Sequence, residues 1–361
     1  MVAARGILLC GGGTGGHVMP GLALAAACRQ EGATDLRWIG DPERLEARLV
    51  PAAGIPLLPY GLSRPRLRSW RWWLQSLGRG FHCFQSLRRE PPRVIIALGG
   101  YAALLPGLLA PLLRRPLVVC EQNAWPGRTN RLLARRAALV ITQFPEARRA
   151  LPGARVACLG NPVRAFAPSP RGDKPGLRVL VMGGSLAAQS LNDCLAAAAA
   201  GLAQIPGLQL LHLAGEADRE RMQGIYSQAG VDAEVFGFVD DMAAIYARVD
   251  LAVCRAGATT VAEACVVGLP VIYIPLPWAA EDHQTANARA VARRGGAVVL
   301  AQQDLHPAAL VYLLRRLHGD RAALKQLADG ALAQAHPRAA TVVAQRIGAL
   351  VGSDGEGRRR W

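Results

Sequence analysis

The chain alternates short, nearly continuous apolar runs with longer runs rich in Ala and Leu, and glycine-rich turns separate many of them. Apolar runs stand at residues 5–10, 93–98, 117–120, 177–182 and 251–255. A continuous apolar run of this length is typical of a strand buried on both faces, while the longer runs suit helices. Strands that alternate with helices predict an α/β protein with parallel sheets.

The first glycine turn is the densest. Five glycines occupy the six positions from Gly11 to Gly16, and His17 follows directly. Glycine allows a sharp turn and a close approach to main-chain N–H groups. The following helix, with Pro20 expected in its first turn, adds unpaired amides and a favourable dipole. The pattern predicts an anion site between strand and helix, and a tight turn without a ligand is the alternative.

The pattern of a strand, a glycine turn and a helix occurs a second time from residue 177, where a strand leads into Gly183-Gly184 and then into a helix. A chain of 361 residues is long enough for two domains, and residues 167–176, rich in Pro, Ser, Gly and charge, form the candidate linker. We expect two Rossmann-like domains with a cleft between them, at residues 1–163 and 164–336.

Polar residues and glycines follow two further strands of the first half. Gly99-Gly100-Tyr101 comes after one strand, and Glu121-Gln122-Asn123 comes after the next. Ligands of parallel α/β sheets lie beyond the carboxyl ends of the strands. We therefore expect both segments and the first glycine turn to face one crevice.

The chain contains 42 Lys and Arg residues but only 26 Asp and Glu residues, which gives a net charge of +16. This excess of positive charge favours anionic partners. The eight cysteines form no C-x-x-C pair, and several lie in strand-like runs, which indicates reduced core thiols of a cytosolic protein. No signal peptide precedes the first strand, and the longest apolar run, 102–113, contains Pro106, Gly107 and Pro111. It is too short and broken to span a bilayer, so we expect a soluble or peripheral protein.

Residues 64–74 hold three Trp and four Arg, and apolar positions continue at helical spacing to Phe84. A basic helix with an aromatic, apolar face can lie in a membrane interface. The alternatives are a core helix with a basic rim and a nucleic-acid site, for which no known module is visible. The residues expected at an anionic membrane are Trp70, Trp72, Trp73, Leu74, Leu77, Phe81, Arg66, Arg68 and Arg71.

Together these motifs resemble the MurG family, bacterial transferases that add N-acetylglucosamine to lipid I and so form lipid II. The matching segments are Gly-Gly-Thr-Gly-Gly-His at 12–17, Gly-Gly-Tyr at 99–101, Glu-Gln-Asn at 121–123, Gly-Asn-Pro-Val-Arg at 160–164, Gly-Gly-Ser at 183–185, residues 256–263 and Asp-His-Gln at 282–284. They occur in order over nearly the whole chain. The resemblance implies the GT-B fold, a UDP-N-acetylglucosamine (UDP-GlcNAc) donor, inversion at the anomeric carbon and peripheral attachment to the cytoplasmic membrane face. We also expect a C-terminal helix within 337–361 that returns toward the first domain, ending in a basic tail.

The resemblance assigns the acceptor's diphosphate to the first glycine loop. The acceptor-binding residues it implies are Gly13, Thr14, Gly15, Gly16, Gly99, Gly100 and Tyr101. Transfer to the C4 hydroxyl of N-acetylmuramic acid (MurNAc) needs a base, and a neutral histidine at a helix N-terminus suits that task near pH 7. His17 is the first candidate and Glu121 the second, while His17 acting only as a cap or phosphate ligand is the alternative.

The resemblance assigns the donor mainly to the second half of the chain, with further contacts from the first half. Arg164 would bind phosphate, since a guanidinium holds phosphate oxygens in a bidentate fork, and Glu263 would accept the ribose hydroxyls. The donor-binding residues it implies are Thr14, Gly15, Gly16, Asn123, Arg164, Ser185, Val239, Ala258, Thr259, Thr260, Val261, Glu263 and Gln284. The chain departs from the family at Leu186, Ala187 and Cys120, where Gln, Gly and His are common.

Other classes of function fit parts of the sequence. The spacing Gly11-x-Gly13-x-x-Gly16, with Asp41 beyond it, matches a dinucleotide fingerprint and suggests an NAD-dependent oxidoreductase. A GT-B transferase with another lipid-linked or small-molecule acceptor, and a non-enzymatic membrane scaffold, are further alternatives. No metal-ligand motif stands out, so we expect neither a metal nor a cofactor. The expected partners are UDP-GlcNAc, undecaprenyl-pyrophosphoryl-MurNAc-pentapeptide (lipid I), an anionic membrane and other cell-wall synthesis proteins, without nucleic acid.

Overall fold

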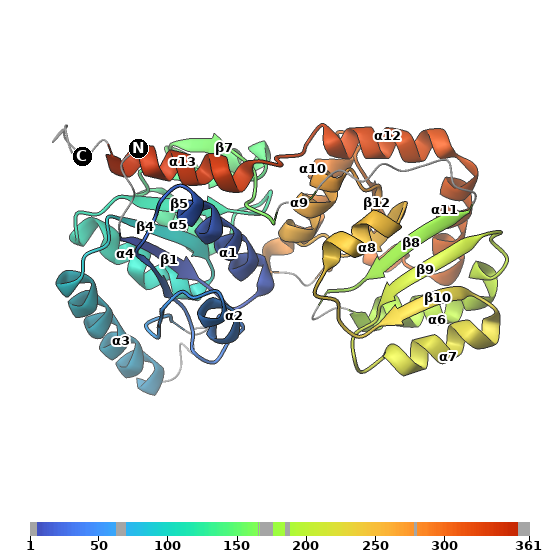
Figure 1. Ribbon diagram of the computed structural model, residues 1–361, viewed down its shortest axis with the longest axis horizontal. Coiled ribbons are helices and arrows are strands. Elements are labelled where there is room, and N and C mark those ends of the chain that lie inside the picture. The colour runs from blue at the N-terminus through green and yellow to red at the C-terminus, as the bar shows by residue number, and fades with distance from the viewer. Residues whose placement is uncertain are drawn as a thin grey trace. The chain divides into compact units, whose positions relative to one another are not determined.

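A computed structural model describes residues 6–62, 70–164, 166, 176–184, 188–277 and 280–352, with backbone only at 70–73, 75, 188 and 280. The chain divides into unit 1, Met1–Ala165 with His336–Trp361, and unit 2, Phe166–Ala335 (Figure 1). The linker predicted at 167–176 lies outside the described residues except for Gly176. Each unit is an α/β structure with a sheet of its own.

Unit 1 contains a parallel sheet in the order β3-β2-β1-β4-β5-β6-β7. Its strands are β1 (Ile7–Gly11), β2 (Leu36–Ile39), β3 (Leu57–Leu58), β4 (Val94–Gly99), β5 (Leu117–Glu121), β6 (Leu139–Thr142) and β7 (Val156–Cys158). Its helices are α1 (Gly15–Gln30), α2 (Glu46–Ala52), α3 (Trp70–Arg89), η1 (Tyr101–Ala103), α4 (Leu104–Leu112), α5 (Arg128–Ala134), η2 (Pro145–Ala150) and α13 (Ala339–Gly352). The last helix packs beside α1, where Val343 and Ile347 join the buried core of unit 1 (Figure 1).

Unit 2 contains a parallel sheet in the order β10-β9-β8-β11-β12-β13. Its strands are β8 (Leu177–Met182), β9 (Leu208–Leu213), β10 (Asp232–Phe236), β11 (Leu251–Cys254), β12 (Val271–Tyr273) and β13 (Val298–Val299). Its helices are α6 (Ala188–Leu202), α7 (Arg219–Ala229), α8 (Met242–Arg248), α9 (Ala258–Val267), η3 (Ala280–Asp282), α10 (His283–Ala292), η4 (Gln302–Asp304), α11 (Pro307–Gly319) and α12 (Arg321–Leu332). Parallel strands in both units confirm the interpretation of the continuous apolar runs.

Two details differ from the sequence analysis. Helix α1 begins at Gly15, five residues before Pro20, which therefore lies inside the helix and not in its first turn. Proline has no N–H, so the helix forgoes one main-chain hydrogen bond there. Cys158 is exposed at the end of β7, whereas the other seven cysteines are buried as expected.

A buried polar network lies within unit 2. His212 on β9 is fully buried, its Nε2 lies 3.0 Å from Asn192 Oδ1, and its Nδ1 lies 2.9 Å from the Tyr226 hydroxyl. Asn192 Nδ2 donates to the Ala214 carbonyl and to Asp218, so its Oδ1 accepts from His212 Nε2–H. The neutral imidazole thus has a partner at each nitrogen, and burial lowers the pKa of His212 from its usual 6.5 to about 4.

We expect the stability of the folded chain to fall in acid because of His212. The unfolded state binds a proton near pH 6.5, while the folded state resists protonation until about pH 4. The resulting loss in the free energy of unfolding is negligible well above pH 6.5 and reaches about 2 kcal/mol at pH 5. Urea unfolding at pH 7.5 and 5 should show a smaller acid loss for His212→Gln than for wild type. The exposed His82→Gln should keep the wild-type loss, and equal losses in all three proteins would contradict the expectation.

Candidate active site

In unit 1 the sequence order of the strands reverses between β1 and β4, and ligands of open α/β sheets bind beside such a reversal. The first glycine turn follows β1, Gly99 ends β4, and Glu121 ends β5. Because β4 pairs with both β1 and β5, these three carboxyl ends are neighbours. The structure therefore confirms that the three predicted strand ends lie together.

His17 lies in the first turn of α1, after the N-cap residue Thr14. Its Nδ1 lies 3.1 Å from the Gly12 carbonyl oxygen and 3.4 Å from the Thr14 hydroxyl. A carbonyl only accepts, so Nδ1 carries the proton and the neutral ring has its lone pair on Nε2. That nitrogen faces Gly99, where a Cβ atom would lie 2.8 Å away. The missing side chain at Gly99 thus makes room for the imidazole.

Glu121 is buried, and four N–H groups surround its carboxylate. Oε1 accepts from the backbone N–H and side-chain amide of Asn123, and Oε2 accepts from the Gly127 N–H and from Asn130 Nδ2. Burial raises the pKa of Glu121, and these hydrogen bonds oppose the shift. The carboxylate fixes the segment that carries Asn123.

Glu46, the first residue of α2, is fully buried, although no sequence pattern pointed to it. Both of its carboxylate oxygens accept from the Gly13 N–H, at 3.1 and 3.0 Å, and Oε1 also accepts from the Asp41 N–H at 3.0 Å. The Gly13 amide, which we expected at the acceptor's phosphate, is thus already engaged. Gly15 and Gly16 begin α1 and carry amides that no carbonyl of the same helix accepts.

In unit 2 the corresponding reversal lies between β8 and β11. Gly183 and Gly184 follow β8, and Arg255 follows β11. Arg255 is buried, and the acceptors of its guanidinium include the Ile274 carbonyl, Gln302 Oε1 and the Ser190 hydroxyl. Ser190 lies in the first turn of α6, so a buried positive charge stands beside the start of that helix. Arg255 was not predicted as a site residue, because it directly follows an apolar strand.

The remaining predicted donor residues lie on several elements of unit 2. Ala258, Thr259, Thr260 and Val261 form the first turn of α9, and Val239 follows β10. The Thr259 hydroxyl oxygen is buried and makes no hydrogen bond with the described part of the chain.

Two predicted donor residues of unit 2 hold local contacts. Glu263 accepts from the Tyr246 hydroxyl at 2.8 Å, and Gln284 Oε1 accepts from the Leu276 N–H at 3.0 Å. Arg164 is exposed and belongs to unit 1, and Ser185, Leu186 and Ala187 lie outside the described residues.

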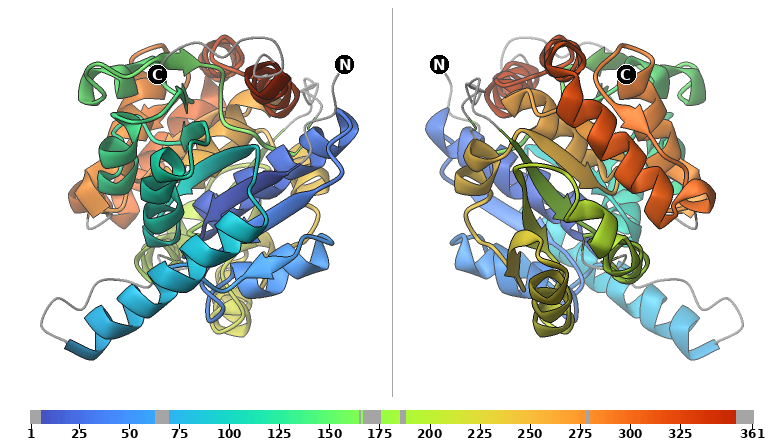
Figure 2. Two further views of the ribbon diagram at one scale, coloured as in Figure 1. Left: turned by 90° about the vertical axis from the view of Figure 1, so that its left-hand side faces the viewer. Right: turned by 90° about the vertical axis from the view of Figure 1, so that its right-hand side faces the viewer.

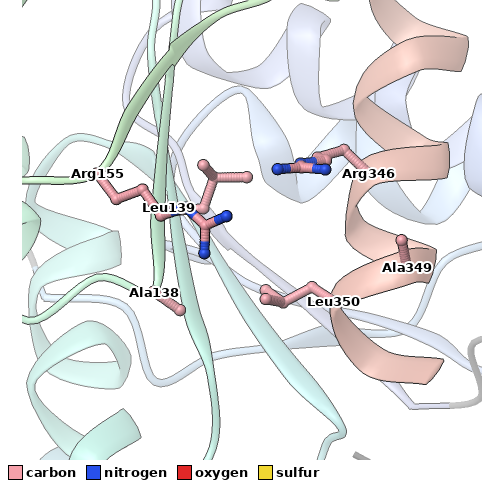
Figure 3. A pocket seen from close by; sticks show the side chains of 6 residues that line it. All are labelled: Ala138, Leu139, Arg155, Arg346, Ala349 and Leu350. Carbon is pink, nitrogen blue, oxygen red and sulfur yellow. The ribbon is translucent and has the colours of Figure 1, made fainter. Parts of the chain in front are cut away.

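Two surface hollows lie away from these loops. One, in unit 1, is lined by Arg155, by Ala138 and Leu139 at the start of β6, and by Arg346, Ala349 and Leu350 of α13 (Figure 3). The other is lined by residues near the amino ends of β8, β9 and β10, among them Arg178 and Asp232. Both hollows therefore lie at the amino ends of the strands, whereas the predicted site residues lie at the carboxyl ends.

Helix α3 exposes an apolar face. Leu74, Leu77 and Phe81 share one side of the helix and are 59, 69 and 59% exposed, whereas Cys83 and Leu87 are buried. The backbone at the start of α3 extends away from the rest of unit 1 (Figure 2). Trp70, Arg71, Trp72 and Trp73 have undescribed side chains, and Arg66 and Arg68 lie outside the described residues.

The described ranges contain neither a membrane span nor a metal centre. No helix there is both long and apolar enough to cross a bilayer. Nowhere in those ranges do three or more His, Cys, Asp or Glu side chains gather as metal ligands would.

Comparison with known proteins identifies the class. The model of the glycosyltransferase family 28 N-terminal domain matches residues 7–142, and that of its C-terminal domain matches residues 178–343. A crystal structure of MurG from Acinetobacter baumannii superimposes with a TM-score of 0.81 at 33% identity, covering 96% of this chain and 99% of that one. The chain is therefore a glycosyltransferase with the GT-B fold, as the sequence predicted.

Curated relatives define the family more closely. A protein of Alkalilimnicola ehrlichii is 42% identical over 350 residues, covering 94% of this chain and 97% of its own. A protein of Halorhodospira halophila is 42% identical over 362 residues, and the match covers 95% of this chain and 98% of that protein. Both are named UDP-N-acetylglucosamine–N-acetylmuramyl-(pentapeptide) pyrophosphoryl-undecaprenol N-acetylglucosamine transferase. The chain belongs to the MurG family, which sets aside the oxidoreductase and scaffold alternatives.

Proposed function

We propose that the protein transfers N-acetylglucosamine from UDP-GlcNAc to the C4 hydroxyl of the MurNAc of lipid I, with inversion, and so makes lipid II for the bacterial cell wall. The activity for which relatives that match nearly the whole chain are named carries this proposal. The acceptor oxygen bonds to the anomeric carbon, the bond from that carbon to the diphosphate breaks, and UDP leaves. The proton of the hydroxyl passes to a base.

His17 is the base in this proposal. Its proton lies on Nδ1 against the Gly12 carbonyl, so Nε2 can accept the proton of the attacking hydroxyl. Glu121 suits the task less well, because its two oxygens already accept four hydrogen bonds that hold Asn123 and its neighbours. We therefore assign Glu121 to positioning and keep Asn123 as a ligand of the donor sugar.

Positive charge and unpaired amides would stabilise the leaving diphosphate. The start of α6, with Ser185 before it, and the start of α9 are the candidate contacts, and the buried Thr259 hydroxyl is free of intramolecular hydrogen bonds in the described ranges. Arg164 is the predicted phosphate ligand, and the buried guanidinium of Arg255 adds positive charge beside α6. Glu263, Gln284 and Val239 remain the proposed contacts of ribose, sugar and uracil.

Transfer of radiolabelled sugar from UDP-GlcNAc to a short-chain lipid I analogue tests the proposal. We expect labelled lipid product, and tight binding of UDP. A protein that binds UDP and transfers sugar to a different lipid-linked acceptor would support the alternative GT-B transferase. Failure to transfer to any lipid-linked MurNAc acceptor would contradict the proposal.

We further propose that the apolar face of α3 binds the cytoplasmic membrane surface, which carries the lipid acceptor. Leu74, Leu77 and Phe81 offer exposed apolar area on one side of α3, and the chain's net charge of +16 favours anionic lipid. Their exposure argues against the alternative in which this face packs into the core. Contacts with other cell-wall synthesis proteins remain an expectation from the resemblance.

Replacing Leu77 and Phe81 together by Glu should weaken binding to anionic vesicles at least about tenfold, because two apolar side chains then leave the interface. Co-sedimentation with vesicles measures the effect. The matched control places two Glu at Leu332 and Tyr312, which are 40 and 63% exposed in unit 2. Equal binding of wild type and the α3 variant would rule out this face as the anchor.

A further inference from the structure

We propose that Glu46 is a positioning residue for the transfer, and that it acts on His17 through the peptide group that joins Gly12 to Gly13. The inference rests on the proposed role of His17 as the base. It concerns a carboxylate that lies 33 residues from Gly13 in sequence, on a different helix from His17.

The carboxylate end of this connection is closed to solvent. Glu46 is fully buried, and both of its oxygens lie within 3.1 Å of the Gly13 nitrogen. The Asp41 N–H donates to the same carboxylate, so Glu46 joins the turns that follow β1 and β2. A hydrogen bond between an N–H and an ionised carboxylate is about twice as strong as one between neutral groups.

The imidazole end uses the other half of the same peptide group. The Gly13 N–H and the Gly12 carbonyl belong to one peptide bond, and the carbonyl oxygen lies 3.1 Å from His17 Nδ1. Hydrogen bonds in a chain polarise one another, so a carboxylate on the N–H makes the carbonyl oxygen a better acceptor. A better acceptor holds the Nδ1–H tautomer and stabilises the imidazolium that forms when Nε2 takes a proton.

Glycine is required at both sides of this peptide group. A Cβ atom at Gly12 would lie 1.8 Å from Glu46 Oε1, and a Cβ atom at Gly100 would lie 2.7 Å from the Gly12 oxygen. Any side chain at either position would therefore separate the carboxylate from the peptide or the peptide from its neighbours. Gly12 thus serves the connection from Glu46 through the peptide to His17, besides the proposed role of the turn in binding an anion.

Besides Glu46 of α2, two elements beside the first glycine turn carry an ionisable side chain, Glu121 at the end of β5 and Tyr101 in η1. Glu121 of β5 holds Asn130 Nδ2, which would lie 3.4 Å from a Cβ atom at Gly99, on the side of His17 Nε2. Tyr101 of η1 follows Gly100 and is 44% exposed. Glu46 therefore acts on the Nδ1 side of the ring, and the Glu121 network lies on the Nε2 side.

The test is the titration of the His17 imidazole by NMR in the full-length protein. Glu46→Gln removes the charge while keeping the shape, and we expect the pKa of His17 to fall by about half a pH unit or more. Asp41→Asn is the matched control, because it removes a charge from the segment between β2 and α2, close to Glu46 in sequence, while its side chain does not bond to the Gly12–Gly13 peptide. The proposal is overturned if Glu46→Gln leaves the titration unchanged, or if Asp41→Asn lowers it equally.

A second measurement needs no variant and covers the case in which Glu46→Gln does not fold. The nitrogen shifts of neutral wild-type His17 must report a proton on Nδ1, and a proton on Nε2 overturns the proposal. In transfer assays, the acid limb of kcat/KM should move to lower pH in Glu46→Gln by the shift seen in the titration. If His17→Ala keeps its activity, the assignment of the base fails, whereas the titration still reports the coupling between Glu46 and His17.

Discussion

Replacing His17 by Ala is expected to lower the turnover of sugar transfer by about 10²–10⁴-fold, the range typical of a lost general base. The attacking hydroxyl then has no positioned group to take its proton. Steady-state transfer to a lipid I analogue measures the change, and UDP binding should persist because the donor residues are intact. A loss below tenfold in a folded variant would rule out His17 as the base.

His17→Asn separates the two tasks of the imidazole. The Asn amide can donate to the Gly12 carbonyl, as Nδ1 does in the structure at 3.1 Å, but it cannot accept a proton at neutral pH. We expect His17→Asn to be as inactive as His17→Ala. Activity near wild type in the Asn variant would mean that His17 only anchors the glycine turn.

Replacing Gly99 by Ala is expected to lower turnover by about 10²-fold, the loss that follows a displacement of about 1 Å in a catalytic group. The new Cβ would lie 2.8 Å from His17 Nε2, so the ring must move away from its present position. The backbone at Gly99 also has a φ of 109°, which side chains rarely adopt. Transfer kinetics and the thermal midpoint should be measured together.

Gly153→Ala is the matched control for Gly99→Ala. Gly153 has a φ of 74° and no atom within 4 Å of its missing Cβ, so it carries the backbone strain without the steric contact. We expect Gly153→Ala to lower the thermal midpoint and keep its turnover. Should both variants lose turnover to the same degree, the contact with His17 is not the cause.

The sheets were predictable because strands buried on both faces leave continuous apolar runs, as at β1 and β8. The proximity of the carboxyl ends of β1, β4 and β5 was also predictable, since parallel strands all have their carboxyl ends on the same side of the sheet. Glu46 could not be found in this way. A single acidic residue at the start of a short helix resembles a solvated one until the fold buries it against Gly12 and Gly13.

The face of α3 shows a second limit. The spacing of Leu74, Leu77 and Phe81 places them on one side of a helix, but spacing alone does not say whether that side meets the core or the solvent. Only the structure shows that these side chains are exposed while Cys83 and Leu87 are buried. Arg255 illustrates the reverse case, in which a charged residue beside an apolar strand is buried by its surroundings.

Helix α13 links the order of synthesis to the order of folding. It supplies Val343 and Ile347 to the interior of unit 1, although all of unit 2 separates it from the other helices and strands of that unit. A ribosome therefore releases the first half of the chain with its hydrophobic interior still open on one side. The core of unit 1 can be completed only after α13 has left the exit tunnel, and hydrophobic surface that stays open until then favours chaperone binding.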